Sequence, residues 1–113
     1  MANETTKNNF EIRKVLGLST MHITQKTTHR LARDPEDNNL GLTIYPFEYG
    51  WWVFIGNVSF KEDKIYYDNE PITSLPSDLI DCIKIGLEND CQWLQFDCDA
   101  EEYDNLPIYY DLD

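Results

Sequence analysis

The chain has 113 residues, a formal net charge of −12, and 42% hydrophobic and 13% aromatic residues. This length fits one compact domain, and the aromatic content supplies enough apolar surface for a core, which excludes wholesale disorder. No apolar run approaches the roughly 18 to 20 residues that span a bilayer, and the N-terminal residues lack the apolar stretch of a signal peptide. We therefore expect a cytoplasmic protein without a membrane segment, in which residues 1–9 are a frayed polar segment and residues 10–113 form one domain.

The first predicted element is a strand that begins after Lys14. Apolar and polar residues alternate from there to Thr24, which places Thr20 and His22 together on a polar face. These two residues form a candidate polar site, because a hydroxyl beside an imidazole is the minimum for nucleophilic catalysis. Their spacing matches no known nucleophile motif, and a strand histidine between threonines is more often a structural hydrogen-bonding group.

A short helix is predicted over residues 25–33. Thr24 is a residue type that caps helix N-termini. The sequence Asp34-Pro35 is expected to end the helix, and residues 36–39 are expected to form a turn.

Two apolar runs, at residues 40–47 and 51–58, predict an antiparallel hairpin. A three-residue segment that ends in Gly50 separates the runs, and we expect this glycine to supply a positive φ in the turn. The hairpin is dense in aromatic residues, and two short helices cannot cover both of its faces. Its aromatic side chains therefore either all belong to the core or also form a partner surface, for which Tyr49 and Trp51 are the candidates.

The second half of the chain contains the clearest helix. The remaining predicted elements are a short strand at residues 65–67, a loop at 68–74, a helix at 76–89, a strand at 91–99 and a short strand at 107–110. In the strand at 91–99, alternation points Leu94, Phe96 and Cys98 toward the core and Trp93 to the opposite face. This order of elements predicts the α+β class, with a single two-layer domain, a largely antiparallel sheet and two helices.

The three cysteines, Cys82, Cys91 and Cys98, are expected to be reduced and mostly buried thiols. Their spacings match no zinc motif, and the cytoplasm keeps thiols reduced. No phosphate-cradling glycine loop, nucleophile elbow or helical histidine pair occurs in the sequence. We therefore expect a protein that is not an enzyme and needs no cofactor.

Charge is distributed unevenly along the chain. Residues 1–33 carry a net charge of +4 and residues 34–113 a net charge of −16, and no basic residue follows Lys84. Such a field repels phosphate, so we expect no direct binding of nucleic acid, whereas a basic protein surface would be attracted. Solubility is the simplest explanation of these charges.

The densest acidic segment lies at the end of the strand at residues 91–99. Its carboxylates are Asp97, Asp99, Glu101, Glu102 and Asp104. Two carboxylates spaced by two on a strand could hold Mg²⁺ or Ca²⁺, but the spacing is not that of an EF-hand, and no lysine follows for phosphate chemistry. We therefore interpret the cluster as a solvated acidic rim without a metal, and as the candidate contact surface for a partner together with Trp93.

Three segments carry a family resemblance. They are Ser19-Thr20-Met21-His22-Ile23-Thr24, Cys91-Gln92-Trp93-Leu94-Gln95-Phe96-Asp97-Cys98-Asp99 and Leu106-Pro107-Ile108-Tyr109. The chain resembles, over most of its length after residue 15, an uncharacterised family of small proteins carried by bacterial mobile elements and phages. That family has Arg where this chain has Cys98, and the resemblance implies no catalytic residues.

Small acidic proteins of mobile elements are often inhibitors that occupy the nucleic-acid-binding surfaces of host defence complexes. The resemblance therefore implies an acidic interaction protein that binds a basic host or mobile-element protein, such as an antirestriction or anti-CRISPR inhibitor that mimics nucleic acid. Two alternatives stay open. One is a small metal-dependent or His/Asp-based enzyme that uses Thr20, His22 and the acidic cluster. The other is a homo-oligomer, for example a homodimer, in which the basic N-terminal third of one copy docks on the acidic remainder of a second.

Overall fold

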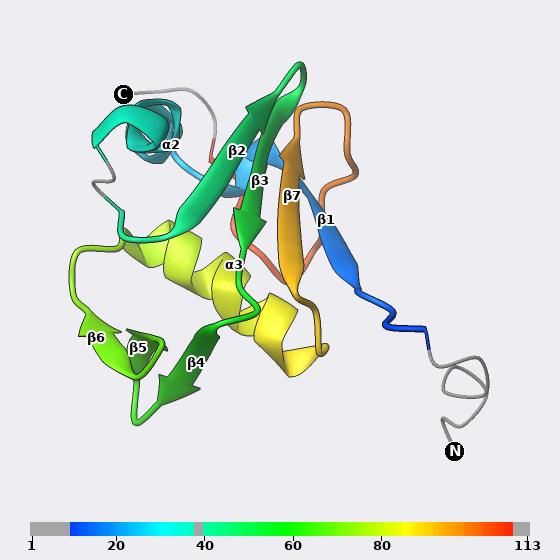
Figure 1. The fold of residues 1–113 in the computed structure, drawn as a ribbon. Coiled ribbons are helices and arrows are strands. Elements are labelled where there is room, and N and C mark those ends of the chain that lie inside the picture. Colours follow the sequence, from blue (N-terminus) through cyan, green and yellow to red (C-terminus); the bar gives the residue numbers. More distant parts are fainter. Residues whose placement is uncertain (1–9, 38–39, 110–113) are drawn as a thin grey trace.

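In the computed structural model, residues 10–37 and 40–109 are described, and they form two β-sheets and two α-helices (Figure 1). The elements follow the order β1 (Val15–Ser19), the 3₁₀ helix η1 (Thr20–His22), α2 (Gln25–Asp37), β2 (Thr43–Phe47), β3 (Gly50–Phe54), β4 (Val58–Lys61), β5 (Lys64–Tyr67), β6 (Glu70–Ile72), α3 (Ser77–Glu88) and β7 (Trp93–Asp97). The predicted α+β class is confirmed. None of the described helices is long and apolar enough to cross a membrane. The frayed segment predicted at residues 1–9 lies outside the described residues.

The larger sheet has the strand order β1-β7-β3-β2. β2 and β3 form the predicted hairpin, but its second strand ends at Phe54 and not at residue 58, because Val58 begins β4 of the other sheet. β7 pairs antiparallel with β3 and parallel with β1. The first and last strands of the chain, blue and orange in Figure 1, are thus neighbours. The smaller sheet, β4-β5-β6, is antiparallel throughout. Sheet pairing in the protein is therefore mostly antiparallel, as predicted.

The two faces of the larger sheet differ in what covers them. One cross-strand row consists of Leu16, Leu94, Val53 and Ile44. Leu94, Val53 and Ile44 are buried in the core cluster, to which α3 contributes Leu79 and Ile83 and α2 contributes Leu31. Both helices therefore pack on this side of the sheet, which we call the core face.

The strand predicted to run from residue 15 to Thr24 is wrong in its second half. β1 ends at Ser19, whose hydroxyl oxygen accepts a hydrogen bond from the backbone N–H of Met21 at 3.0 Å. This side-chain cap favours the 3₁₀ turn of η1 over a continued strand. Thr20 and His22 consequently do not alternate along a strand.

The helix α2 begins where predicted but ends later. Thr24 caps it, because its Oγ1 atom accepts a hydrogen bond from the backbone N–H of Thr27 at 3.3 Å. The helix continues through Asp34-Pro35 to Asp37, so the predicted end and the predicted turn at residues 36 and 37 are wrong. A proline near the end of a helix removes a single backbone donor, which does not stop the last turn from forming. Residues 38 and 39 lie outside the described part of the chain.

The prediction that Gly50 has a positive φ is wrong. Its φ is not positive, and the left-handed glycine of the described residues is Gly41. Gly50 starts β3 directly beside β7, where a Cβ atom would collide with the carbonyl oxygen of Phe96. The position thus requires glycine because two backbones approach closely, and not because the turn is left-handed.

Three further predictions are corrected by the structure. Glu70–Ile72 is strand β6 and not part of a loop, because the Asp68-Asn69 pair, both residues with positive φ, forms a tight two-residue hairpin to β5. No strand forms at residues 107–109, where the backbone N–H of Tyr109 donates to the carbonyl oxygen of Met21 at 2.8 Å. Cys98 follows the end of β7 and is exposed, whereas Cys82 and Cys91 are buried as predicted.

Candidate functional site

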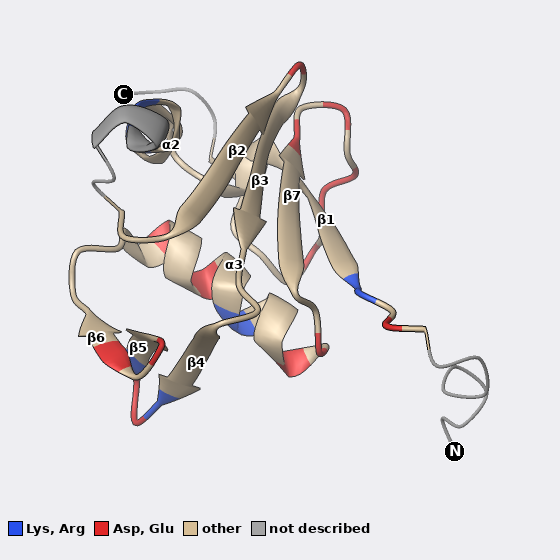
Figure 2. Ribbon diagram, in the orientation of Figure 1, with Lys and Arg blue, Asp and Glu red and all other residues tan. Residues whose placement is uncertain are grey.

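Two loops place carboxylates at one end of the larger sheet. We define the acidic end as Glu48 from the β2–β3 turn together with Asp97, Asp99, Glu101, Glu102 and Asp104 from β7 and the segment that follows it. The two loops are joined by a hydrogen bond of 3.0 Å from the backbone N–H of Cys98 to the carbonyl oxygen of Tyr49. Figure 2 shows acidic positions on both loops and no basic position on either. The structure thus brings together the predicted acidic cluster and a carboxylate that the sequence separates from it by about half the chain.

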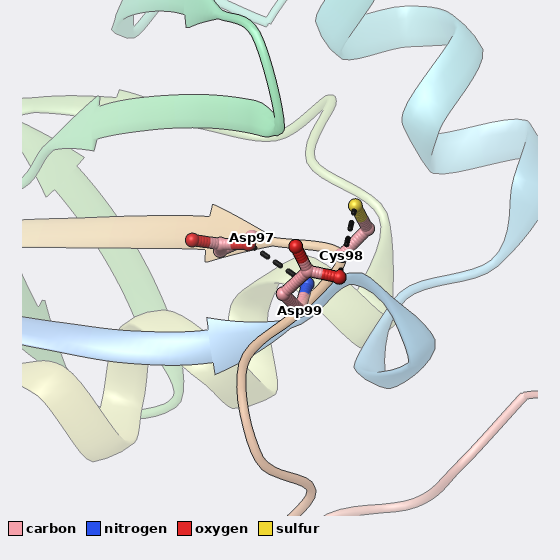
Figure 3. A group of neighbouring side chains, drawn as sticks. All are labelled: Asp97, Cys98 and Asp99. Carbon is pink, nitrogen blue, oxygen red and sulfur yellow. Dashed lines mark hydrogen bonds between the residues drawn. The ribbon is translucent and has the colours of Figure 1, made fainter.

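The Asp97-Cys98-Asp99 segment is the one group of described residues whose ligand atoms could surround a metal ion, since these atoms lie within 4.8 Å of one another (Figure 3). Asp97 Oδ1 accepts a hydrogen bond from the backbone N–H of Asp99 at 2.8 Å, and the Cys98 thiol lies 3.9 Å from Asp99 Oδ1. The first of these hydrogen bonds closes a local turn, in which the Asp97 carboxylate binds the backbone N–H of the residue two positions later in the chain. The geometry explains the shape of the turn without an ion.

His22 anchors the acidic segment to the body of the protein. Its ring is 1% exposed, with Nδ1 2.8 Å from the carbonyl oxygen of Pro107, while Nε2 accepts a hydrogen bond from the backbone N–H of Tyr103 at 3.0 Å. An imidazole that donates at Nδ1 and accepts at Nε2 is neutral. Both ring nitrogens of His22 are therefore engaged by backbone groups of the segment that follows β7.

Tyr103 provides the second anchor. Its ring stacks on His22 with the ring centroids 5.9 Å apart and an interplanar angle of 9°, and its hydroxyl donates to the carbonyl oxygen of Gly17 at 2.8 Å. Glu101, Glu102 and Asp104 are exposed on either side of this anchored tyrosine. The segment that carries these acidic residues is thus hydrogen-bonded to the rest of the protein on both sides of them, at Cys98 and at Pro107.

A surface pocket of about 540 Å³ lies between α2 and the β2–β3 hairpin. Of the predicted site residues, it brings together Thr20, Tyr49 and Trp51, and Cys98 also lines it. Trp51 packs against the core cluster, and Tyr49 is 47% exposed. Trp93 is not among the residues that line this pocket.

Sequence reasoning missed the polar centre that joins the two helices. Asp78, in the first turn of α3, is 5% exposed and accepts hydrogen bonds from the backbone N–H of Thr24 and the hydroxyl of Thr27. The only signal in the sequence was an acidic residue at a helix N-terminus, which is common at exposed positions. Nothing in it indicated that the same carboxylate accepts hydrogen bonds from the N-terminal end of the other helix, α2.

The buried thiol of Cys82 should make the stability of the protein depend on pH in the alkaline range. Burial, and next the negative charges of Asp78 and Asp81, raise the pKa of the Cys82 thiol from 9.0 to about 12. The folded state therefore keeps a proton that the unfolded state loses, so this group's contribution to stability is complete below pH 9.0 and is lost as the pH rises toward 12. Urea denaturation from neutral to alkaline pH should show the Cys82→Val variant losing stability less steeply than wild type, by up to about 1.4 kcal/mol per pH unit. Equal slopes for the two proteins would contradict the prediction, and the exposed Cys98→Ser variant is the control.

Comparisons with known proteins gave one family match. No curated protein and no solved structure matches the chain. A family model described as the C-terminal domain of a family of unknown function, DUF5983, matches residues 15–111. The match covers most of the chain, including every helix and strand of the structure, and agrees with the resemblance to an uncharacterised family. The chain therefore belongs to the DUF5983 family of unknown function, in the region of its C-terminal domain.

Proposed function

We propose that the protein is a small acidic interaction protein that binds a basic partner protein through the acidic end. The observation that carries this proposal is the convergence of the β2–β3 turn with the last residue of β7 and the segment that follows it, which together contain six carboxylates and no lysine or arginine. The anchoring of the second loop at His22 and Tyr103 supports it, since fixed charges lose less side-chain and backbone entropy on binding.

The partner that fits this surface is a protein that itself binds nucleic acid. Such proteins carry clustered lysine and arginine residues that neutralise phosphates, and a fixed array of carboxylates attracts the same cations. Together with the resemblance to proteins of mobile elements and phages, this charge pattern favours an inhibitor of host defence that mimics nucleic acid, of the antirestriction or anti-CRISPR kind. Binding would be strongest at low ionic strength, because salt screens exposed charges.

The proposal is tested with two charge-matched variants. The first removes four charges from the acidic end: Asp99→Asn, Glu101→Gln, Glu102→Gln and Asp104→Asn. The control removes four charges from the smaller sheet: Glu62→Gln, Asp63→Asn, Asp68→Asn and Glu70→Gln. All eight residues are exposed, so both variants should fold, and both have the same net charge. Asp97 is left in place because it holds the turn.

We expect the first variant to bind a basic protein captured from host lysate roughly tenfold more weakly than wild type, since an exposed ion pair contributes about 0.2–1 kcal/mol and four are removed. The control should bind like wild type. The dissociation constant is measured with the purified partner at low and high salt. Equal losses in the two variants would show that only net charge matters, and unchanged binding in the first variant would exclude the acidic end as the contact surface.

A further inference from the structure

The side of the larger sheet opposite the core face is aromatic. Its strand residues include Tyr45, Phe47, Trp52, Phe54 and Trp93. Their rings contact one another, with centroid separations from 4.9 Å for Phe54 and Trp93 to 6.2 Å for Tyr45 and Trp93. We call this surface the aromatic face.

No helix of the described residues covers the aromatic face. Both helices contribute to the core cluster, and the partly buried residues that pack against that cluster include none of these five rings. Tyr45 is 56% exposed, and Val15, on the same side of β1, is 45% exposed. A Cβ atom at Gly17, in the cross-strand row of Tyr45 and Trp52, would meet no other atom within 4 Å. The aromatic face is therefore exposed at the two edge strands, where Val15 and Tyr45 lie, and its central rings are partly exposed.

The charge on this face has one sign. Among the described strand residues that point to this side, Asp97 is the only charged one, and it connects the aromatic face to the acidic end. Gln95 lies at the centre, paired with Trp52 on one side and Gly17 on the other. The face thus combines large aromatic surfaces with negative charge at its border, which is complementary to cations that also have an apolar surface.

We propose that the aromatic face binds a segment of the basic partner that carries arginine, with guanidinium groups over the rings of Trp52 and Trp93. The inference rests on the proposed function, because it names the chemistry of the same partner. Arginine fits better than lysine, since its planar guanidinium stacks on aromatic rings and is more weakly hydrated. Tryptophan is the ring that attracts cations most strongly.

Two other occupants fit the face less well. Single-stranded nucleic acid stacks on aromatic residues but also needs cations that follow its backbone, and this face has none among its described strand residues. A second copy would bring together two chains that each carry a net charge of −12, with Asp97 on both facing surfaces. Charge complementarity therefore favours the basic partner.

The test uses a synthetic peptide in which arginine alternates with valine, titrated into the full chain at low salt. Binding is followed by tryptophan fluorescence and by calorimetry. Peptides with lysine or with neutral citrulline at the arginine positions are the comparison ligands. Two variants contain the same substitution and the same change in charge: Gln95→Lys at the centre of the aromatic face, and Gln25→Lys at the exposed start of α2. Tyr45→Ala, at an exposed position, is a second face variant that should not affect folding.

We expect saturable quenching of tryptophan fluorescence by the arginine peptide. Gln95→Lys should reduce the affinity roughly tenfold, which is the size of one desolvated cation–aromatic contact plus local charge repulsion. Gln25→Lys should leave the affinity unchanged. Tyr45→Ala should weaken binding several-fold, the lysine peptide should bind more weakly than the arginine peptide, and the citrulline peptide should not bind.

The inference is overturned if wild type shows no saturable binding, or if the two lysine variants bind equally. Loss of peptide binding only in the four-site acidic variant would overturn the inference while leaving the proposed function in place. Loss only in the Gln95→Lys and Tyr45→Ala variants would support the aromatic face as the binding surface and would count against the acidic end. Sedimentation without peptide tests the remaining occupant, since a dimer that Gln95→Lys dissociates would assign the face to a second copy.

Discussion

Replacing Asp78 by alanine is expected to lower the free energy of unfolding by about 3 kcal/mol. The carboxylate is 5% exposed and joins the N-termini of both helices. Its Oδ2 atom lies 2.7 Å from the backbone nitrogen of Thr24, both of its oxygens lie 2.8 Å from the hydroxyl of Thr27, and Oδ1 accepts from the backbone N–H of Leu79 at 3.0 Å. Alanine would leave these buried donors without an acceptor. Urea denaturation at neutral pH measures the loss.

Asp81 is the matched control for this substitution. It lies on the same helix one turn later and is exposed, so Asp81→Ala should change the stability by less than about 0.5 kcal/mol. Asp78→Asn should fall between the two, since the amide keeps one acceptor oxygen but not the charge. If Asp78→Ala and Asp81→Ala cost the same, the carboxylate does not hold the two helices together.

Gly50→Ala is expected to destabilise the protein by about 2–3 kcal/mol, the range of overpacking in a closely fitted interior. Its added methyl group would collide with the carbonyl oxygen of Phe96, which belongs to the backbone of β7 and cannot rotate away as a side chain could. The substitution should therefore separate β3 from β7 near the acidic end. Thermal unfolding measures the cost, and hydrogen exchange locates it at the β3–β7 pairing.

Gly17→Ala tests whether this cost is specific. Gly17 lies in β1, two strands away from β3, and a Cβ atom there would meet nothing within 4 Å. We expect this substitution to be neutral or slightly stabilising, because alanine loses less backbone entropy on folding than glycine. Equal losses at Gly17 and Gly50 would indicate a general dependence on strand glycines and would contradict the collision argument.

The local patterns that the sequence contains were sufficient for the most regular elements. The apolar stripe after Pro76 predicted α3 almost to its ends, because burial of one helix face depends only on residues three or four apart. Alternation around Leu94 and Phe96 likewise predicted which side of β7 is buried, and both residues are 0% exposed. Alternation failed at Thr20 and His22, where the Ser19 side chain stabilises a turn that periodicity cannot detect.

Only part of the candidate site could be predicted from the sequence. The acidic residues at 97–104 and the surplus of negative charge could be read directly from the chain. The position of Glu48 beside them could not, since it depends on β7 inserting between β1 and β3. Nor could the pairing of His22 with Tyr103, whose hydrogen bond joins residues separated by 81 positions.

The sequence by itself determined the α+β class, the two helices, the hairpin and the sign of the charge, because each depends on composition or on neighbours within a few residues. Only the tertiary structure decided which loops meet at the acidic end, that Asp78 joins the N-terminal ends of the two helices, and that one aromatic face of the sheet stays uncovered. These features depend on strand order and on contacts between distant segments. Many arrangements of the same elements satisfy the local patterns equally, and packing of the shared core selects one of them.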